Sequence, residues 1–302
     1  MPRDREADVL MRRAWRARTV IPGFNVAYLP MIEPVVRALR DTRCFGLVSV
    51  SRPDWAKLGA GSLAAVRDAY ETVKDERFAR LHVDHVPVID EDGQTVDAES
   101  ILREAVGLGY PSIMIDASRL PLDENIAVVR RVVAFAHAAG VAVEAELGAV
   151  MGHEPGPLPP YEELFASGRG FTDPEEARRF VAETLADWLS VAVGSVHGTL
   201  GERRVEKKVE ARLHIDHLDR VARAADVPLV LHGGTGIRKA YVLEAVRHGI
   251  AKINVATAIR QPYEAAMGES VEKAQAAVYA ATARVIRQDL EIEGSADVVN
   301  PA

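Results

Sequence analysis

Eight short apolar runs recur along the chain, and segments with helical periodicity separate them. In one such segment, Ile126, Val129 and Val133 are three or four residues apart with polar residues between them, which is typical of an amphipathic helix. Runs that are apolar on both faces indicate parallel strands covered by helices. The eight runs span residues 20–26, 46–51, 78–83, 112–115, 141–147, 188–196, 229–231 and 250–255.

This alternation predicts a protein of the α/β class, a single-domain (β/α)₈ barrel over residues 1–302. The length alone would also suit two domains, but no linker or shift in composition divides the chain. We expect an N-terminal helix within residues 1–18 and a mobile active-site loop, rich in glycine and proline, over residues 149–172. The active site of such a barrel lies at the carboxyl ends of its strands.

Charge and cysteine content narrow the kind of partner. A net charge of −7 argues against a nucleic-acid-binding surface. No apolar run approaches the ~20 residues of a membrane span. Cys44 is the only cysteine, so an internal disulfide is impossible and a reducing, cytoplasmic location is expected. A small molecule is therefore the expected partner, with neither nucleic acid nor membrane.

Histidines end three of the apolar runs. The third run leads into His82, Asp84 and His85, and two later runs end at His197 and His232. Alternate side chains of a strand share a face, so His85 would point away from Asp84 unless the chain bends there. A lone buried histidine is more often a hydrogen-bonded core residue, but three from three strand ends suit a catalytic zinc site.

Other polar residues fall at the same predicted end of the barrel. Asn25 and Ser51 end the first two strands, where they could equally be turn formers. Glu144 and Glu146 lie inside the fifth apolar run, where burial is costly unless the acids are paired or bind a cation. Glu146 is nearer the barrel mouth and is the better candidate for a role. Glu154, near the start of the long loop, could fold over the mouth.

A phosphate site is predicted at the seventh and eighth strands. The glycine-rich turn Gly233-Gly-Thr235-Gly opens a helix, and exposed backbone N–H groups at a helix start bind anions. Barrels often bind phosphate with the loops after these two strands, and the eighth run supplies Asn254 and Thr257.

A second His-x-Asp-His pattern, His214 to His217, repeats the one in the third strand. Leu218, Val221 and Ala225 follow it at helical spacing. We therefore interpret His214 and its neighbours as polar residues at a helix start, not as metal ligands.

Taken together, these motifs resemble the class II, zinc-dependent ketose-bisphosphate aldolases, the family of fructose- and tagatose-bisphosphate aldolases. The likeness runs along nearly the whole chain. The matching motifs include Gly23-Phe-Asn-Val, His82-Val-Asp-His85, Val143-Glu-Ala-Glu-Leu-Gly148, Val193-Gly-Ser-Val-His-Gly198, Leu229-Val-Leu-His-Gly-Gly-Thr-Gly-Ile237 and Lys252-Ile-Asn-Val-Ala-Thr257.

The resemblance implies a zinc ion as cofactor, and it leaves room for a monovalent cation. It also implies a homodimer or homotetramer. The implied zinc ligands are His85, His197 and His232, with Glu146 as a further acid near the metal. Zinc acting as a Lewis acid would stabilise the oxyanion that forms when a bond beside a carbonyl breaks, so no Schiff-base lysine is needed.

The resemblance also assigns catalytic roles. Asp84 would take the proton of the hydroxyl at the bond being cleaved, Glu154 would exchange a proton with carbon, and Asn254 would hydrogen-bond the enediolate. The phosphate of dihydroxyacetone phosphate would be bound by Gly198, Gly233, Thr235 and Thr257. Asn25 and Ser51 match positions near the aldehyde half.

The chain departs from the family pattern beside the third strand. Val86 and Pro87 follow His85, and the stretch to Asp97 is several residues longer than usual and contains three consecutive acids, Asp90 to Asp92. Negative charge there would repel a second phosphate unless Arg52 or another cation offsets it. Our hypothesis is an aldehyde substrate without a distal phosphate.

Two alternative functions stay open on the sequence. One is a related lyase that acts on a modified sugar or sugar-acid phosphate. The other is a metal-binding sugar-phosphate sensor without turnover. Asp84 and Glu154 argue against the sensor, since a non-catalytic barrel needs neither acid.

Overall fold

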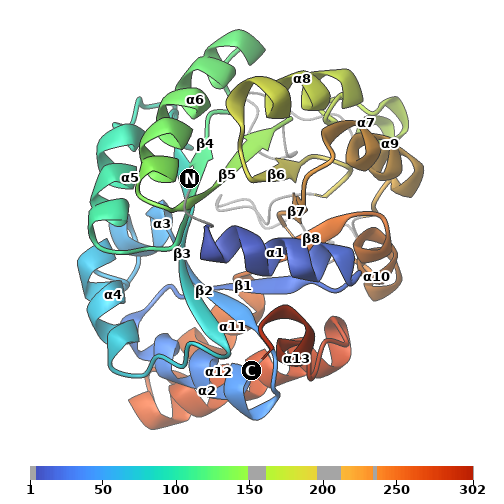
Figure 1. Cartoon of the computed structure of the whole chain (residues 1–302). Coiled ribbons are helices and arrows are strands. Elements are labelled where there is room, and N and C mark those ends of the chain that lie inside the picture. The colour runs from blue at the N-terminus through green and yellow to red at the C-terminus, as the bar shows by residue number, and fades with distance from the viewer. Residues whose placement is uncertain (1–4, 149–160, 196–211, 234–236, 302) are drawn as a thin grey trace.

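The eight strands form a closed parallel barrel in which each strand pairs with the next and β8 pairs with β1 (Figure 1). The computed structural model describes residues 5–148, 161–195, 212–233 and 237–301. The predicted barrel is confirmed. Its strands are β1 (Ile21–Asn25), β2 (Gly46–Ser51), β3 (Ala79–Pro87), β4 (Ser112–Asp116), β5 (Ala142–Leu147), β6 (Trp188–Val191), β7 (Leu229–Leu231) and β8 (Ile250–Val255).

Two strand ends differ from the sequence prediction. Strand β3 continues to Pro87 because Pro87 still pairs with Asp116 of β4, although the register shifts between Val83 and Val86. Strand β6 ends at Val191 instead of continuing to residue 196.

Helices surround the barrel, as expected for a parallel sheet that is buried on both faces. They are α1 (Glu6–Arg16), α2 (Ile32–Asp41), α3 (Arg52–Ala56), α4 (Leu63–Glu71), α5 (Ala98–Gly107), α6 (Leu122–Ala138), α7 (Tyr161–Ser167), α8 (Pro174–Thr184), α9 (Ile215–Ala225), α10 (Lys239–Arg247), α11 (Thr257–Ala266), α12 (Val271–Arg284) and α13 (Ala296–Val299). Side chains of Asp97 and Asp173 accept backbone N–H groups at the starts of α5 and α8, which satisfies otherwise unpaired donors. The apolar face predicted around Ile126 and Val129 of α6 is buried.

Part of the segment expected to be a loop is helical. Residues 161–167 form α7, whose Phe165 packs against Phe171 at 6.1 Å and against His214 at 5.9 Å between ring centroids. These tertiary contacts give a short helix the apolar partner that it needs. Residues 149–160 of the expected loop lie outside the described residues.

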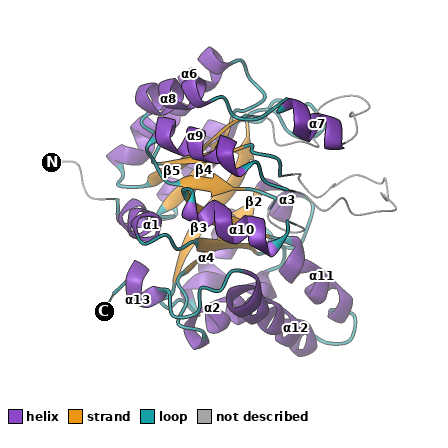
Figure 2. Ribbon diagram, turned by 90° about the vertical axis from the view of Figure 1, so that its right-hand side faces the viewer, coloured by secondary structure: helices purple, strands orange, loops and turns teal. Residues whose placement is uncertain are grey.

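Helix α1 lies across the amino-terminal end of the barrel (Figure 1). Leu10 and Met11 on its inner face are buried in a cluster with Phe45, Trp188 and Val230 from the barrel. Figure 2 shows α1 and α13 at this end of the molecule, while α3, α7 and α11 lie toward the other. The chain thus closes one end of the barrel with apolar side chains.

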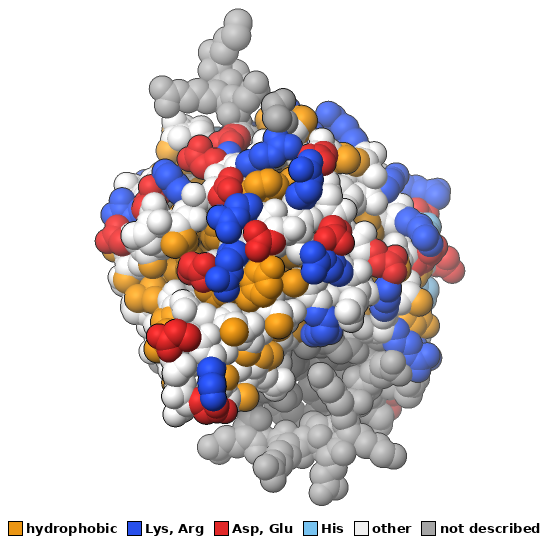
Figure 3. Space-filling model, turned by 90° about the horizontal axis from the view of Figure 1, so that it is seen from below, with side chains coloured by type: hydrophobic (Ala, Val, Ile, Leu, Met, Phe, Trp, Pro, Cys, Tyr) orange, Lys and Arg blue, Asp and Glu red, His pale blue; other side chains and the backbone are white. Residues whose placement is uncertain are grey.

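The outer surface carries charges of both signs. On the face in Figure 3, lysine and arginine side chains are interspersed with acidic ones among the described residues. Within the described part of the chain, the helices lack the combination of length and apolar character required to span a membrane.

Asp187 joins three elements at the closed end. Its Oδ1 accepts from Arg5, just before α1, at 2.7 Å. Its Oδ2 lies 2.9 Å from Nε2 of His137 in α6 and accepts the backbone N–H of Val143 in β5 at 2.8 Å. Because Asp187 is 2% exposed, removal of its carboxylate leaves these donors without their partner in a buried place.

Asp187→Ala should therefore lower the free energy of unfolding by about 3 kcal/mol, the scale for breaking a buried charge network. Urea denaturation of the metal-free protein measures this quantity. Asp297→Ala is the matched control, because Asp297 pairs with Arg43 and Arg77 on the exposed surface and should change stability little. Equal losses in the two variants would contradict the role assigned to Asp187.

Candidate active site

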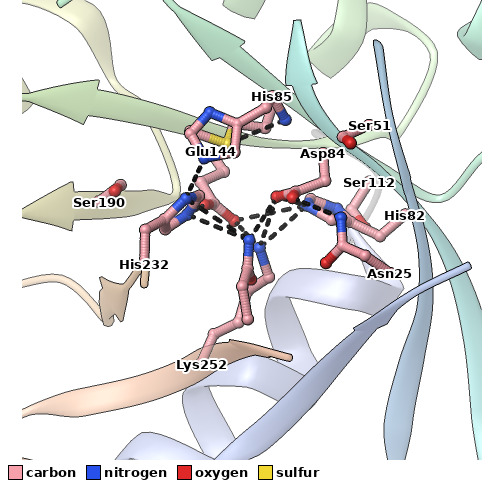
Figure 4. Close-up of polar contacts among 12 residues, drawn as sticks. Asn25, Ser51, His82, Asp84, His85, Ser112, Glu144, Ser190, His232 and Lys252 are labelled. Carbon is pink, nitrogen blue, oxygen red and sulfur yellow. Dashed lines mark hydrogen bonds and ion pairs between the residues drawn. The ribbon is translucent and has the colours of Figure 1, made fainter. Parts of the chain in front are cut away.

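The interior of the barrel holds a polar cluster at the carboxyl ends of the strands (Figure 4). His85 owes its place in this cluster to a bulge in β3. Its φ of 39° is in the left-handed region, and the strand register shifts around it. In regular alternation His85 would point away from Asp84. The bulge turns its ring toward His232 of the β7 end, with ring centroids 4.3 Å apart.

His85, His232 and Glu146 form a group that could hold a metal ion. Their potential ligand atoms lie within 4.8 Å of one another. Nε2 of His85 and Nδ1 of His232 face each other, and the Glu146 carboxylate is 3.9 Å from Nδ1 of His85. Two imidazoles and a carboxylate are a donor set that suits zinc, so these residues fit the ion.

Glu144 orients His232. Nε2 of His232 lies 2.8 Å from Oε1 of Glu144, so this nitrogen carries the proton that it donates to the carboxylate. The lone pair of His232 is then on Nδ1, the nitrogen that faces His85. A carboxylate that fixes the tautomer in this way is a common partner of metal-binding histidines.

Electrostatics make this group attractive to cations. Burial would lower the pKa of His85, but a hydrogen bond with Asp116 and the charges of Asp84 and Glu146 raise it to about 10. Burial and the charge of Asp116 raise the pKa of Glu146 well above its ordinary value. Burial and the positive charge of His85 lower the pKa of His232. The pocket therefore favours one positive charge beside a neutral His232.

Asp84 is held by amide donors on both of its oxygens. Asn25 donates to Oδ2 at 2.8 Å and Asn254 donates to Oδ1 at 2.7 Å. Burial would raise the pKa of Asp84, but the positive charges of Lys252 and His85 hold it well below its ordinary value. Asp84 is thus an ionised carboxylate in a fixed orientation, although it is 1% exposed.

The role of Lys252, which lies next to Asp84, was not predicted from the sequence. Lys252 of β8 is completely buried, and its ammonium contacts Glu144, His82 and Asp84. Burial would raise the pKa of Glu144, but the charge of Lys252 and the hydrogen bond with His232 lower it to about 2. A signal was present: a lysine inside the apolar run 250–255 must find a partner when buried, as must the acids of β5.

Of the remaining predicted site residues, the structure describes Ser51, Gly233 and Thr257. Ser51 is the N-cap residue of α3, where its backbone N–H and its hydroxyl donate to Oδ2 of Asp54 at 2.8 and 2.6 Å, so a helix-start role is present. Gly233 follows β7 with a φ of 70°, and Thr257 is the first residue of α11 after β8. Both thus lie at the expected strand ends. The predictions for Glu154, His197, Gly198 and Thr235 fall outside the described residues.

The second His-x-Asp-His pattern starts a helix, as interpreted from the sequence. Helix α9 begins at Ile215, and Nδ1 of His214 accepts the backbone N–H of His217 at its start. Nε2 of His217 lies 2.8 Å from the carbonyl oxygen of Thr172. The contacts of both rings are therefore those of a helix start and its neighbouring loop.

Comparison with known proteins shows the family and the fold of the chain. The family model for class II fructose-bisphosphate aldolase matches residues 5–297. The YdjI aldolase of Escherichia coli K12 has a similar structure (TM-score 0.75, 26% identity, 96% of this chain and 98% of that chain covered). A putative fructose-1,6-bisphosphate aldolase from Coccidioides immitis is also similar (TM-score 0.74, 27% identity, 95% of this chain and 96% of that chain covered). Fructose-bisphosphate aldolase from Campylobacter jejuni shares the fold (TM-score 0.73, 17% identity, 96% of each chain covered).

The chain therefore belongs to the class II fructose-bisphosphate aldolase family. It is an aldolase, an enzyme that makes and breaks carbon–carbon bonds. Members of this family are generally zinc-dependent, and His85, His232 and Glu146 could hold such an ion.

Gly23 of β1 gives the site its space. A Cβ atom at this position would lie 3.0 Å from Oγ of Ser49, 3.2 Å from Oδ1 of Asn254 and 3.3 Å from Cε of Lys252. These distances are tighter than ordinary contacts, so the neighbours would have to move.

Gly23→Ala should displace Asn254 and Lys252 and lower kcat by about tenfold or more while the barrel stays folded, because small displacements in an active site are costly. Steady-state kinetics and circular dichroism measure the two effects. Gly107→Ala at the end of α5 is the control, since nothing lies within 4 Å of its added Cβ. Unchanged kcat in Gly23→Ala would contradict this account.

Proposed function

We propose that the protein is a zinc-dependent aldolase that reversibly cleaves a phosphorylated ketose to dihydroxyacetone phosphate and an aldehyde. The observation that carries the proposal is the fixed carboxylate of Asp84 beside the His85–His232 pair. A proton acceptor next to a cation site is what this cleavage requires.

His85, His197 and His232 would hold the zinc ion, with Glu146 as a nearby acid. The bound ion supplies a Lewis acid that stabilises negative charge on the ketose carbonyl oxygen. Glu144 contributes by keeping His232 in the tautomer whose lone pair is on Nδ1. The negative charge of Asp116 adds to the attraction for a cation.

Asp84 would act as the general base. Its carboxylate takes the proton from the hydroxyl group adjoining the bond to be cleaved. As that oxygen becomes the aldehyde carbonyl, the carbon–carbon bond breaks and its electron pair remains with the ketone half. Asn25 and Asn254 hold the two carboxylate oxygens, so Asp84 needs little reorganisation to receive the proton.

The ketone half must then regain a proton at carbon. We assign this step to Glu154 on the segment after β5. Asn254 lies between Asp84 and His232 and can also accept a hydrogen bond from a hydroxyl group of the ketone half, since its buried Oδ1 has no hydrogen-bond partner among the described residues. Gly198, Gly233, Thr235 and Thr257 would bind the phosphate.

The barrel rim beside β3 is where we expect the aldehyde half of the substrate to bind. Residues 88–96 form a short hairpin, closed by the bridge between Ile89 and Thr95. Arg52, next to Ser51 at the end of β2, lies 3.3 Å from Oδ2 of Asp90. Arg119, after β4, donates to the carbonyl oxygen of Asp90.

The other acids of the hairpin, Glu91 and Asp92, pair with Lys57. Arg52 and Lys57 therefore offset the acidic stretch, as the charge argument from the sequence allowed. Because these cations already have carboxylate partners, a distal phosphate would have to compete for them. The paired cations offset the repulsion that the acidic stretch alone would exert, so our hypothesis of an aldehyde without a distal phosphate rests on this competition.

The function is tested by measuring dihydroxyacetone phosphate release from a panel of ketose phosphates, with and without a chelator. The wild type should lose activity when zinc is removed and regain it when zinc returns. Asp84→Ala should lower cleavage by about 10³-fold, the scale of a lost general base, while it keeps zinc. His197→Ala should lose both metal and activity.

Each alternative has its own outcome in this experiment. Zinc binding without cleavage of any substrate would favour the sugar-phosphate sensor. Cleavage restricted to sugar-acid phosphates would favour the related lyase. Full metal occupancy in His197→Ala would show that His197 is not a ligand.

Specificity is tested by comparing kcat/KM for fructose 1,6-bisphosphate and fructose 1-phosphate, because the ratio reports differential binding of the transition state. We expect a preference for the monophosphate. Asp90→Asn keeps the amide-accepting Oδ1 of the turn but removes the charge beside Arg52, and should shift the ratio toward the bisphosphate by about fivefold. Asp92→Asn, on the exposed side of the hairpin, is the control. A strong wild-type preference for the bisphosphate would refute the hypothesis.

A further inference from the structure

Lys252 lies at the centre of three acceptors in the middle of the barrel (Figure 4). Its Nζ is 2.7 Å from Oε2 of Glu144, 3.1 Å from Nε2 of His82 and 3.4 Å from Oδ1 of Asp84. A lysine ammonium has three N–H donors and no acceptor. The three contacts therefore match its full donor capacity, and Lys252 is completely buried among them.

The neighbouring hydrogen bonds fix the direction of this network. Because Nε2 of His82 accepts from Lys252, the proton of this neutral imidazole is on Nδ1. Nδ1 lies 2.9 Å from Oγ of Ser112, which can receive that proton. The Ser112 hydroxyl then donates to the carbonyl oxygen of Leu81 at 3.5 Å. Each of these groups thus has a consistent donor or acceptor role, so His82 is a structural acceptor for Lys252.

The same three acceptors have the arrangement of a metal site. Ligand atoms of His82, Asp84 and Glu144 lie within 4.8 Å of one another, as do those of His85, Glu146 and His232. In the group of His82, Asp84 and Glu144, however, the ammonium of Lys252 already contacts all three residues. The lysine supplies there the positive charge that two buried carboxylates require.

We propose that Lys252 is a built-in cation that positions Asp84 directly and His232 through Glu144. The inference rests on the proposed function, which gives Asp84 the role of base and His232 that of zinc ligand. Oε2 of Glu144 accepts from Lys252, while Oε1 faces Nε2 of His232. One carboxylate thus joins the lysine to the metal-binding imidazole.

Lys252 and Asn254 act on Asp84 from the same strand. They are two residues apart in β8 and so share a face, and both contact Oδ1 of Asp84. Loss of the ammonium would leave Asp84 and Glu144 as buried carboxylates without their cation, and both would be expected to reorient. Lys252 is therefore a positioning residue for the base and for one zinc ligand.

Lys252→Met tests this role, because methionine fills similar space without charge or donors. We expect kcat to fall by about 100-fold and the zinc affinity of the substrate-free protein to fall by about tenfold or more, the scale for partners of metal ligands. Chelator competition measures the affinity, independently of activity. Lys273→Met is the matched control, since Lys273 pairs with Glu269 on the surface. Wild-type zinc affinity with kcat within about threefold of wild type would overturn the inference.

Chemical rescue tests the inference even if a Lys252 variant fails to fold. Lys252→Ala leaves room for a small amine, so propylammonium should restore both the circular dichroism spectrum and zinc binding. Tetramethylammonium, which has no N–H donor, should not. Absence of rescue by propylammonium in a misfolded Lys252→Ala, or equal rescue by both ions, would overturn the inference.

The wild type in the same assays separates this inference from the proposed function. A wild-type protein that neither binds zinc nor cleaves a ketose phosphate would contradict the proposed function, whatever the Lys252 variants do. An active, zinc-binding wild type with an indifferent Lys252→Met would contradict the role of Lys252 alone.

Discussion

The contact between the Lys252 ammonium and the carboxylates of Glu144 and Asp84 is the interaction on which the interior of this barrel depends. Buried charges are tolerated only when they are paired and hydrogen-bonded. In this barrel, the pairing brings together side chains from β3, β5 and β8, none of which are neighbours in the ring. The neutral His82 and the amides of Asn25 and Asn254 complete the network. A polar core of this kind holds its side chains in one arrangement.

Next to the network around Lys252, a local break in the geometry of β3 makes the candidate metal group possible. A regular β3 would place Asp84 and His85 on opposite faces, so one of them would leave the barrel interior. The positive φ of His85 allows both to face inward. Backbone strain of this type costs on the order of 1–3 kcal/mol and persists where surrounding contacts compensate for it. The pairing of Val86 and Pro87 with β4 supplies such contacts.

Polar residues have different roles at the two ends of the barrel. At the closed end, Asp187 joins Arg5, His137 and the backbone of β5, and apolar residues of α1 complete the seal. At the open end, polar side chains converge around His85 and His232, and the hairpin 88–96 extends the rim with its own paired charges. Stability and chemistry are thus largely separated, as is usual in barrels of this class.

The amino-acid sequence was sufficient to predict the barrel, because eight apolar runs in alternation with amphipathic helices have few other ways to bury their surfaces. It also indicated Asp84, His85, Glu146, His232 and Asn254, since polar residues at strand ends meet at one end of a barrel. The contacts of Lys252, Glu144 and Asp116 could not be predicted from the sequence, because charge pairing between strands that are not neighbours depends on register and on side-chain reach. The bulge at His85 and the cap formed by Ser51 were decided only by the tertiary structure: local alternation and turn propensity allow several outcomes, and only packing against neighbouring strands and helices selects one.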